Sequence, residues 1–146
     1  MIRAQFVLDA SVALSWYFPD QQRDSAQELK RRLIQGEEAI VPAVFSLELV
    51  YVLAEAERSR GARASDSGEF LDMIMGLSLL QDRDCVLEPM AFGRILDLCR
   101  QFRLSSHDAC YLELAIRLGI PIATYDQDLI RAARKSGIDV LSSEAA

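Results

Sequence analysis

Four acidic side chains stand where carboxylates could act together in catalysis or metal binding. Asp9 follows an apolar run in QFVLD, and Asp126 follows another in PIATYD. Asp108 lies three residues after Ser105 in SSHDACYLELA, and Glu48 interrupts the apolar stretch PAVFSLELVYVL. Three of them have an ordinary alternative explanation, because acids commonly cap helices or occupy their first turn. Glu48 is harder to explain in that way.

Glu48 lies in a predicted helix whose neighbouring positions at helical spacing are apolar, among them Val44, Phe45 and Val52. A helix that is apolar over so much of its circumference is expected to be largely buried, and an isolated buried carboxylate is costly unless it is paired or binds a cation. Alternatively, Glu48 and Glu55, two turns apart, mark a narrow stripe that faces solvent. The sequence leaves both readings open.

If the four acids converge, their charges determine the chemistry. Two carboxylates about 4 Å apart repel by roughly 4 kcal/mol at an effective dielectric constant of about 20. Either some of them become protonated, with raised pKa values, or a cation binds between them. A site made of carboxylate oxygens without His or Cys suits Mg²⁺ or Mn²⁺ rather than zinc. Such a site predicts metal-assisted hydrolysis of a phosphodiester, with a remaining carboxylate accepting the proton of the attacking water.

The elements that would position these acids alternate between short apolar strands and longer helices. Predicted strands cover residues 5–9, 39–41, 85–87, 121–125 and 139–142. Predicted helices cover residues 11–18, 24–36, 42–60, 65–80, 89–102, 105–118 and 128–137. This order predicts one α/β domain over residues 1–146, a three-layer α/β/α sandwich with a central parallel sheet of about five strands. Ligands of such sheets bind beyond the carboxyl ends of the strands, where Asp9 and Asp126 are expected.

With these motifs in this order, the sequence resembles the PIN-domain ribonucleases along its whole length, and specifically the VapC-type toxins of bacterial toxin–antitoxin pairs. The anchors are VLDASV, PAVFSLELVYVL, SSHDACYLELA and ATYDQDL. The resemblance implies a PIN-like fold and cleavage of single-stranded RNA. It also implies a homodimer and a cognate antitoxin whose tail enters the acidic groove. The catalytic acids that it implies are Asp9, Glu48, Asp108 and Asp126, with Asp9, Asp108 and Asp126 as ligands of Mg²⁺ or Mn²⁺.

Other positions are also assigned by the resemblance. Ser11 and Thr124 match residues that commonly lie beside the metal site, whereas Asp128 matches none of the four acids and retains its reading as a helix-dipole acid. Two positions depart from the common pattern. Tyr51 stands where many members have Asn, and His107 stands where many have an aromatic residue before the third acid. The first departure affects a supporting hydrogen bond and not the ligands.

Composition limits the remaining classes of function. The net charge of −6 argues against a protein that coats nucleic acid by bulk attraction, although local contacts to phosphate remain compatible with it. Arg58, Arg60 and Arg63 in RSRGAR either contact phosphate or simply end a helix. The three cysteines lack CxxC spacing, and no apolar stretch is long enough to span a membrane, so a cytoplasmic protein without disulfides is expected.

Two other classes of function fit the sequence less well than a nuclease. A phospho-accepting receiver domain also places acids around Mg²⁺, but it needs a lysine after a late strand, and the only lysines are Lys30 and Lys135. A catalytically idle PIN-type module that binds RNA or protein is disfavoured by the complete set of acids. The apolar segment 70–80 is predicted either to pack in the core or to form a dimer or antitoxin surface.

Overall fold

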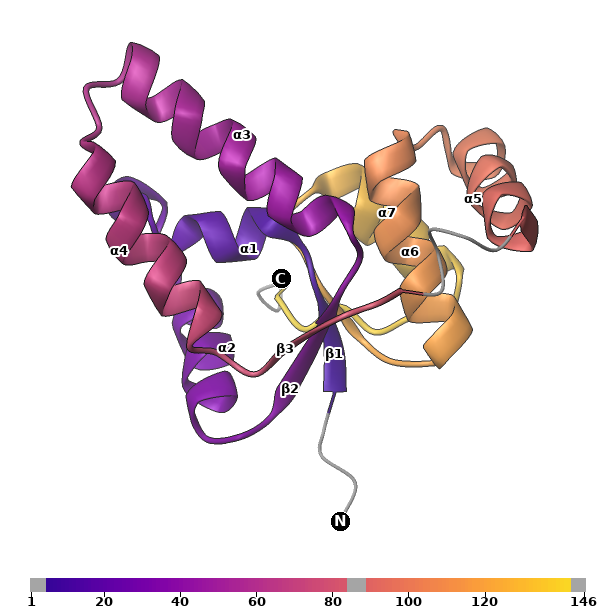
Figure 1. The fold of residues 1–146 in the computed structure, drawn as a ribbon. Coiled ribbons are helices and arrows are strands. Elements are labelled where there is room, and N and C mark those ends of the chain that lie inside the picture. Colours follow the sequence, from indigo (N-terminus) through magenta and orange to yellow (C-terminus); the bar gives the residue numbers. More distant parts are fainter. Residues whose placement is uncertain (1–4, 84–88, 143–146) are drawn as a thin grey trace.

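A four-stranded parallel sheet forms the centre of the molecule, with strand order β3-β2-β1-β4 (Figure 1). The computed structural model describes residues 5–83 and 89–142. Its strands are β1 (Gln5–Leu8), β2 (Glu38–Val41), β3 (Leu79–Gln81) and β4 (Ile122–Ala123). Val140 adds a single parallel bridge to Ile122, at the place where the fifth strand was predicted. The α/β sandwich with a parallel central sheet is therefore confirmed.

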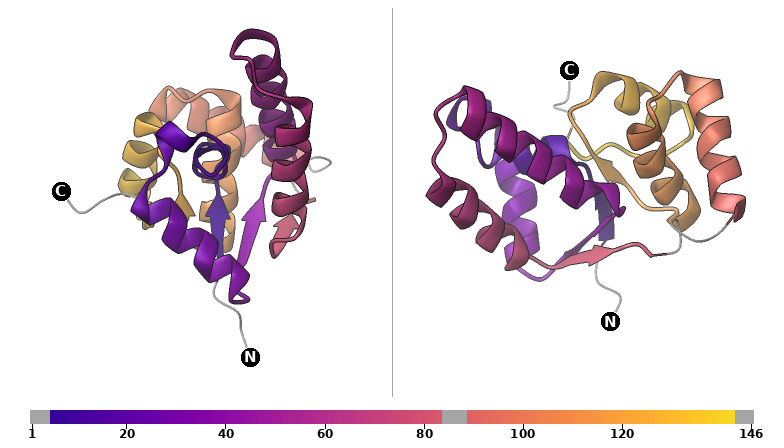
Figure 2. Two further views of the ribbon diagram at one scale, coloured as in Figure 1. Left: turned by 90° about the vertical axis from the view of Figure 1, so that its left-hand side faces the viewer. Right: turned by 45° about the horizontal axis from the view of Figure 1, so that its top comes forward.

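Helices cover both faces of the sheet (Figures 1 and 2). They are α1 (Ala10–Ser15), α2 (Asp24–Ile34), α3 (Val44–Ser59), α4 (Ala64–Met75), α5 (Pro89–Phe102), α6 (Ser106–Leu118) and α7 (Gln127–Lys135). The first four lie on one side and the last three on the other, with α5 packed against α6. Within the described residues, none of these helices has both the length and the apolar character that a membrane span requires.

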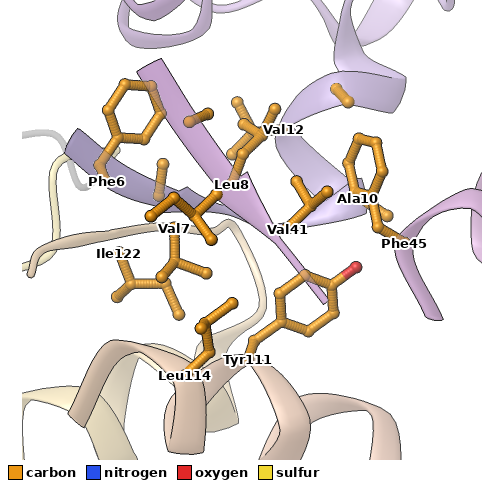
Figure 3. Packing of buried hydrophobic residues seen from close by; sticks show 14 of the residues in the cluster. Phe6, Val7, Leu8, Ala10, Val12, Val41, Phe45, Tyr111, Leu114 and Ile122 are labelled. Carbon is orange, nitrogen blue, oxygen red and sulfur yellow. The ribbon is translucent and has the colours of Figure 1, made fainter. Parts of the chain in front are cut away.

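The core forms around β1, which lies between β2 and β4. Phe6, Val7 and Leu8 are all fully buried, as expected for a parallel strand covered on both faces. Figure 3 shows Tyr111 and Leu114 of α6 among the residues that pack around this strand. Burial of β1 fixes its end, so the residue that follows it is held at the edge where α1 and α3 begin.

One helix is shorter than the sequence predicts. Segment 65–80 was expected to be a single helix, but α4 ends at Met75, and Gly76 caps it. Leu79–Gln81 instead pairs with Ala39–Val41 as strand β3. A continuous apolar run does not distinguish a buried helix from a buried strand, which explains the error. The strand predicted at 85–87 lies outside the described residues.

A buried ion-pair network fastens α6 to the end of β3. The Arg117 guanidinium donates to Glu113 at 2.9 Å and to Asp82 at 2.5 Å. Both carboxylates are almost fully buried, and Arg94 of α5 also contacts Glu113 at 3.2 Å. Buried charges require such partners. The network fixes the end of α6 opposite to the turn that carries Asp108.

Candidate active site

Asp9 directly follows β1 and is 4% exposed. It occupies the N-cap position of α1, yet its side chain makes no capping hydrogen bond. Instead, its Oδ2 atom accepts hydrogen bonds from the Ser11 hydroxyl at 2.6 Å and the Thr124 hydroxyl at 2.7 Å. Burial raises the pKa of Asp9, and these two hydroxyls oppose that effect. The carboxylate therefore serves a purpose other than capping.

The same two hydroxyls connect Asp9 to the segment after β4. Ser11 Oγ accepts a hydrogen bond from the backbone N–H of Tyr125 at 3.0 Å, and Thr124 Oγ1 accepts one from that of Asp126 at 3.0 Å. Each hydroxyl thus donates to the carboxylate and accepts from the backbone. This reciprocal arrangement fixes the Asp9 carboxylate relative to Asp126.

Thr124 is itself held by the C-terminal segment. The Ser142 hydroxyl accepts a hydrogen bond from the Thr124 N–H at 2.7 Å and donates to the Thr124 carbonyl at 2.5 Å. Both residues are almost fully buried. The sequence contained no signal for this support, because Ser142 lies 18 residues away and outside any recognisable motif.

Asp126 and Asp108 each lie at the start of a helix, and both also line the site. Asp126 caps α7, and its Oδ1 accepts from the Leu129 N–H at 2.9 Å. Asp108 lies in the first turn of α6, where its N–H donates to the Ser105 hydroxyl at 3.2 Å. Burial, followed by the charges of Asp126 and Asp9, raises the pKa of Asp108 to about 6. Capping therefore orients the Asp126 carboxylate, whereas the Asp108 carboxylate is positioned through its place in the first turn of α6.

Glu48 lies in the second turn of α3. Its Oε1 atom is buried and has no hydrogen-bond partner. Burial and then the Asp9 charge raise its pKa to about 7, with a further contribution from Asp108. The helix is less buried than predicted, since Leu47 and Tyr51 are 72% and 67% exposed. Glu48 lies at the boundary between these exposed positions and the core.

All four predicted acids line one pocket of about 580 Å³. They come from four separate segments, which the parallel sheet brings to the carboxyl ends of β1, β2 and β4. Ser11 and His107 also line the pocket, and His107 is exposed. Asp128 is not part of its lining; it is exposed and pairs with Arg131 at 2.6 Å.

Tyr111 is a residue of the site region that sequence reasoning missed. It lies three residues after Asp108 on α6 and is fully buried, with no hydrogen-bond partner for its hydroxyl. In Figure 3 the hydroxyl points toward the start of α3. The hydroxyl lowers the pKa of Glu48, although no well-formed hydrogen bond joins the two side chains. The spacing from Asp108 was the available signal, because residues three apart share a helix face.

The donor set fits a hard divalent cation. Oxygen ligands alone favour Mg²⁺ or Mn²⁺, and the unpartnered Glu48 oxygen and raised carboxyl pKa values mark a site that lacks counter-charge. No group of three or more His, Cys, Asp or Glu side chains in residues 5–83 and 89–142 is arranged to hold an ion as it stands. Mg²⁺ usually takes only one or two protein carboxylates and completes its shell with water and substrate oxygens.

Comparison with protein families identifies the fold. A model of the PIN domain matches residues 6–135. The chain belongs to the PIN domain family. PIN domains are typically nucleases and generally use divalent metals. The PIN-domain part of the sequence-based prediction is therefore confirmed.

A solved structure has the same fold. The crystal structure of PAE2754 from Pyrobaculum aerophilum aligns with a TM-score of 0.66 over 94% of this chain and 90% of that one, at 18% identity. At this identity the likeness supports the PIN fold and not a particular substrate. A search of curated proteins found no match.

Proposed function

We propose that this PIN domain is a metal-dependent endoribonuclease that hydrolyses single-stranded RNA. One observation carries the proposal: Asp9, Glu48, Asp108 and Asp126 line the same pocket at the carboxyl edge of the sheet. Four carboxylates from separate segments have no structural need to converge, and their mutual repulsion disfavours it. A site that binds a cation and a phosphodiester accounts for the arrangement.

Asp9, Asp108 and Asp126 would hold Mg²⁺ or Mn²⁺. When bound, such an ion lowers the pKa of water and offsets charge that develops on the phosphate. Asp9 is suited to a fixed ligand position, because Ser11 and Thr124 orient its carboxylate. The Asp126 side chain is restrained by its cap to α7.

Glu48 would accept the proton of the attacking water. Its Oε1 atom has no other partner, and its pKa of about 7 is close to that of an effective general base at neutral pH. Asp9 and Asp108 contribute to that raised pKa through their charges. Glu48 therefore has a role distinct from that of the three ligands.

The proposed biological role is that of a VapC-type toxin. The four sequence anchors and the complete set of acids support this subtype. A cognate antitoxin would block the acidic pocket, and a second copy of the chain would form a homodimer. Val50 and Met75, which are 53% and 83% exposed and line one apolar pocket between α3 and α4, support an apolar contact surface on this side.

Cleavage of single-stranded RNA by matched variants tests the enzymatic proposal. The wild-type protein is expected to cut RNA with Mg²⁺ or Mn²⁺ and to be inactive with chelator. Asp9→Asn should lose at least a hundredfold in rate, whereas Asp128→Asn should retain nearly wild-type activity, since Asp128 lies outside the pocket. Equal activity of the two variants would contradict the assignment. RNA binding without cleavage would indicate a catalytically idle module.

Growth and association measurements test the biological proposal. Expression of the wild-type protein should arrest bacterial growth, whereas expression of Asp9→Asn should not. Light scattering should detect a dimer that Met75→Glu weakens. Arrest by both proteins, or a monomer at high micromolar concentration, would contradict the toxin role or the homodimer respectively.

A further inference from the structure

A second pocket, of about 550 Å³, adjoins the acidic one. Ser11, Leu14, Tyr51 and Val52 line both pockets, so the two form one continuous groove. The second pocket extends away from the carboxylates, between α3 and the segment that joins α1 to α2. A chain molecule bound at the acids could therefore continue into it.

The second pocket offers positive charge beside the acids. Arg23 and Arg60 line it, and neither pairs with a carboxylate in the described part of the chain. The Arg23 guanidinium lies 4.0 Å from the centre of the Tyr125 ring, and that of Arg60 lies 5.5 Å from the Phe18 ring. A guanidinium group beside an aromatic ring still has N–H donors available for phosphate oxygens.

Among the described residues, only two acidic side chains line the second pocket, and one of them is paired with an arginine. Glu55 also lines the second pocket, but it forms an ion pair with Arg58. Asp20 is the other acid of its lining. Of the three arginines in RSRGAR, Arg58 and Arg63 are paired on the surface, with Glu55 and Asp66. Of these three arginines, only Arg60 lines the groove. It is therefore the one residue of the motif that can contact a phosphate there.

Aromatic rings flank the shared part of the groove. Tyr51 lines both pockets and is 67% exposed. Tyr125 is held from two sides: its hydroxyl is hydrogen-bonded to Ser25 at 2.6 Å, and its N–H donates to Ser11, which also binds Asp9. The Tyr125 ring is thus fixed relative to the proposed metal ligand.

We propose that Arg23, Arg60, Tyr51 and Tyr125, here termed the arginine groove, bind the nucleotides next to the scissile phosphate. This inference rests on the proposed ribonuclease function. Arg23 and Arg60 contact phosphates, and an unstacked base packs on a tyrosine ring. Arginines beside the exposed Tyr51 ring and the half-buried Tyr125 ring suit a single strand, whereas the bases of a duplex remain stacked on one another. The groove also explains how a chain of net charge −6 attracts RNA to an acidic pocket.

Binding of a short fluorescein-labelled single-stranded RNA tests the arginine groove. Anisotropy is measured in chelator, where no cleavage occurs, at several salt concentrations. Arg23→Gln, Arg60→Gln and Tyr51→Leu should each weaken binding about tenfold. Each arginine variant should also reduce the slope of log affinity against log salt by about 0.7. Arg131→Gln and Phe92→Leu are matched controls on exposed residues outside both pockets and should bind as the wild type does.

Kinetics separate this inference from the ribonuclease proposal. With Mg²⁺, the groove variants should raise KM about tenfold and change kcat by less than about threefold, because the four acids are intact. Circular dichroism confirms that each variant is folded. If RNA is cleaved but the groove variants have the same RNA affinity and KM as Arg131→Gln and Phe92→Leu, the groove inference fails and the ribonuclease proposal stands. The groove would then suit a protein segment instead. If binding depends on the groove but no RNA is cleaved, the role of the groove in binding single-stranded RNA stands, whereas the ribonuclease proposal and the placement of these nucleotides beside a scissile phosphate fail.

Discussion

The hydroxyl of Thr124 donates a hydrogen bond to Oδ2 of Asp9 at 2.7 Å, although the two residues are 115 positions apart. They meet because β1 and β4 are parallel neighbours, and the backbone N–H of Asp9 also donates to Ala123 at 2.9 Å. The contact ties the central strand to the strand that carries Asp126. It gives the site a fixed reference point.

Replacement of Thr124 by Val should impair both stability and cleavage. Valine keeps the shape of the side chain but removes the donor to Asp9 and the acceptor for the Asp126 N–H. The expected loss of unfolding free energy is about 1–3 kcal/mol, because the buried Asp9 carboxylate loses a donor and the Asp126 N–H loses its acceptor. RNA cleavage should fall about 10- to 100-fold, as for other residues that orient metal ligands.

Thr124→Ser is the matched control, since it retains the hydroxyl. Urea unfolding and single-turnover cleavage should place it much closer to the wild type than Thr124→Val. If the serine and valine variants lost equal activity, the hydroxyl would have no part in positioning Asp9.

Glu48 should make the metal-free protein less stable as pH rises. Its pKa is about 7 in the folded protein and about 4.5 when unfolded. A raised carboxyl pKa contributes stability that is fully present below pH 4.5 and is lost as pH rises through about 7. Glu48→Gln should therefore be more stable than the wild type at pH 8 in chelator, by about 1 kcal/mol after allowance for solvent screening.

Thermal melts between pH 4 and pH 8 in chelator measure this effect. The wild type and the exposed-site control Glu57→Gln should lose stability over the same window, and Glu48→Gln should lose less. Parallel curves for Glu48→Gln and the wild type would show that the Glu48 carboxyl is not destabilised by burial.

Tyr111→Phe should cost little stability, because the hydroxyl that it removes is buried without a partner. We expect a change within about 1 kcal/mol, against a loss of about 3–5 kcal/mol for Tyr111→Ala, which also removes the buried ring. Loss of the hydroxyl should raise the pKa of Glu48 and move the acid limb of the pH–rate profile to higher pH. Destabilisation by more than about 2 kcal/mol would mean that the hydroxyl has a partner in solution.

The parallel sheet and the position of two of the acids could be predicted from the same sequence pattern. Continuous apolar strands followed by acids at their ends define both a parallel sheet and its binding edge, so Asp9 and Asp126 were placed correctly beside it. Glu48 was recognised as unusual, but whether it faced solvent or a pocket depended on how α3 packs. That packing involves residues distant in sequence.

Other features could not be read from local pattern. Strand β3 was predicted as helix because Leu79 and Leu80 continue an apolar run, and only pairing with β2 distinguishes the two structures. In the arginine groove, Arg23 contacts the ring of Tyr125, which lies about 100 positions further along the chain. No local motif could contain both residues. Ser142 likewise acts on Thr124 only through the folded chain.

Calorimetric titration of the wild-type protein with Mn²⁺ near pH 6.5 tests the central claim, that Asp9, Asp108 and Asp126 hold a divalent cation beside Glu48. The account predicts saturable binding with release of protons, because Asp108 and the neighbouring Glu48 are partly protonated at that pH and a bound cation favours their charged forms. Binding should weaken at least tenfold in Asp9→Asn and remain unchanged in Asp128→Asn. Absence of Mn²⁺ binding by the wild type, or equal affinity in Asp9→Asn, would contradict it.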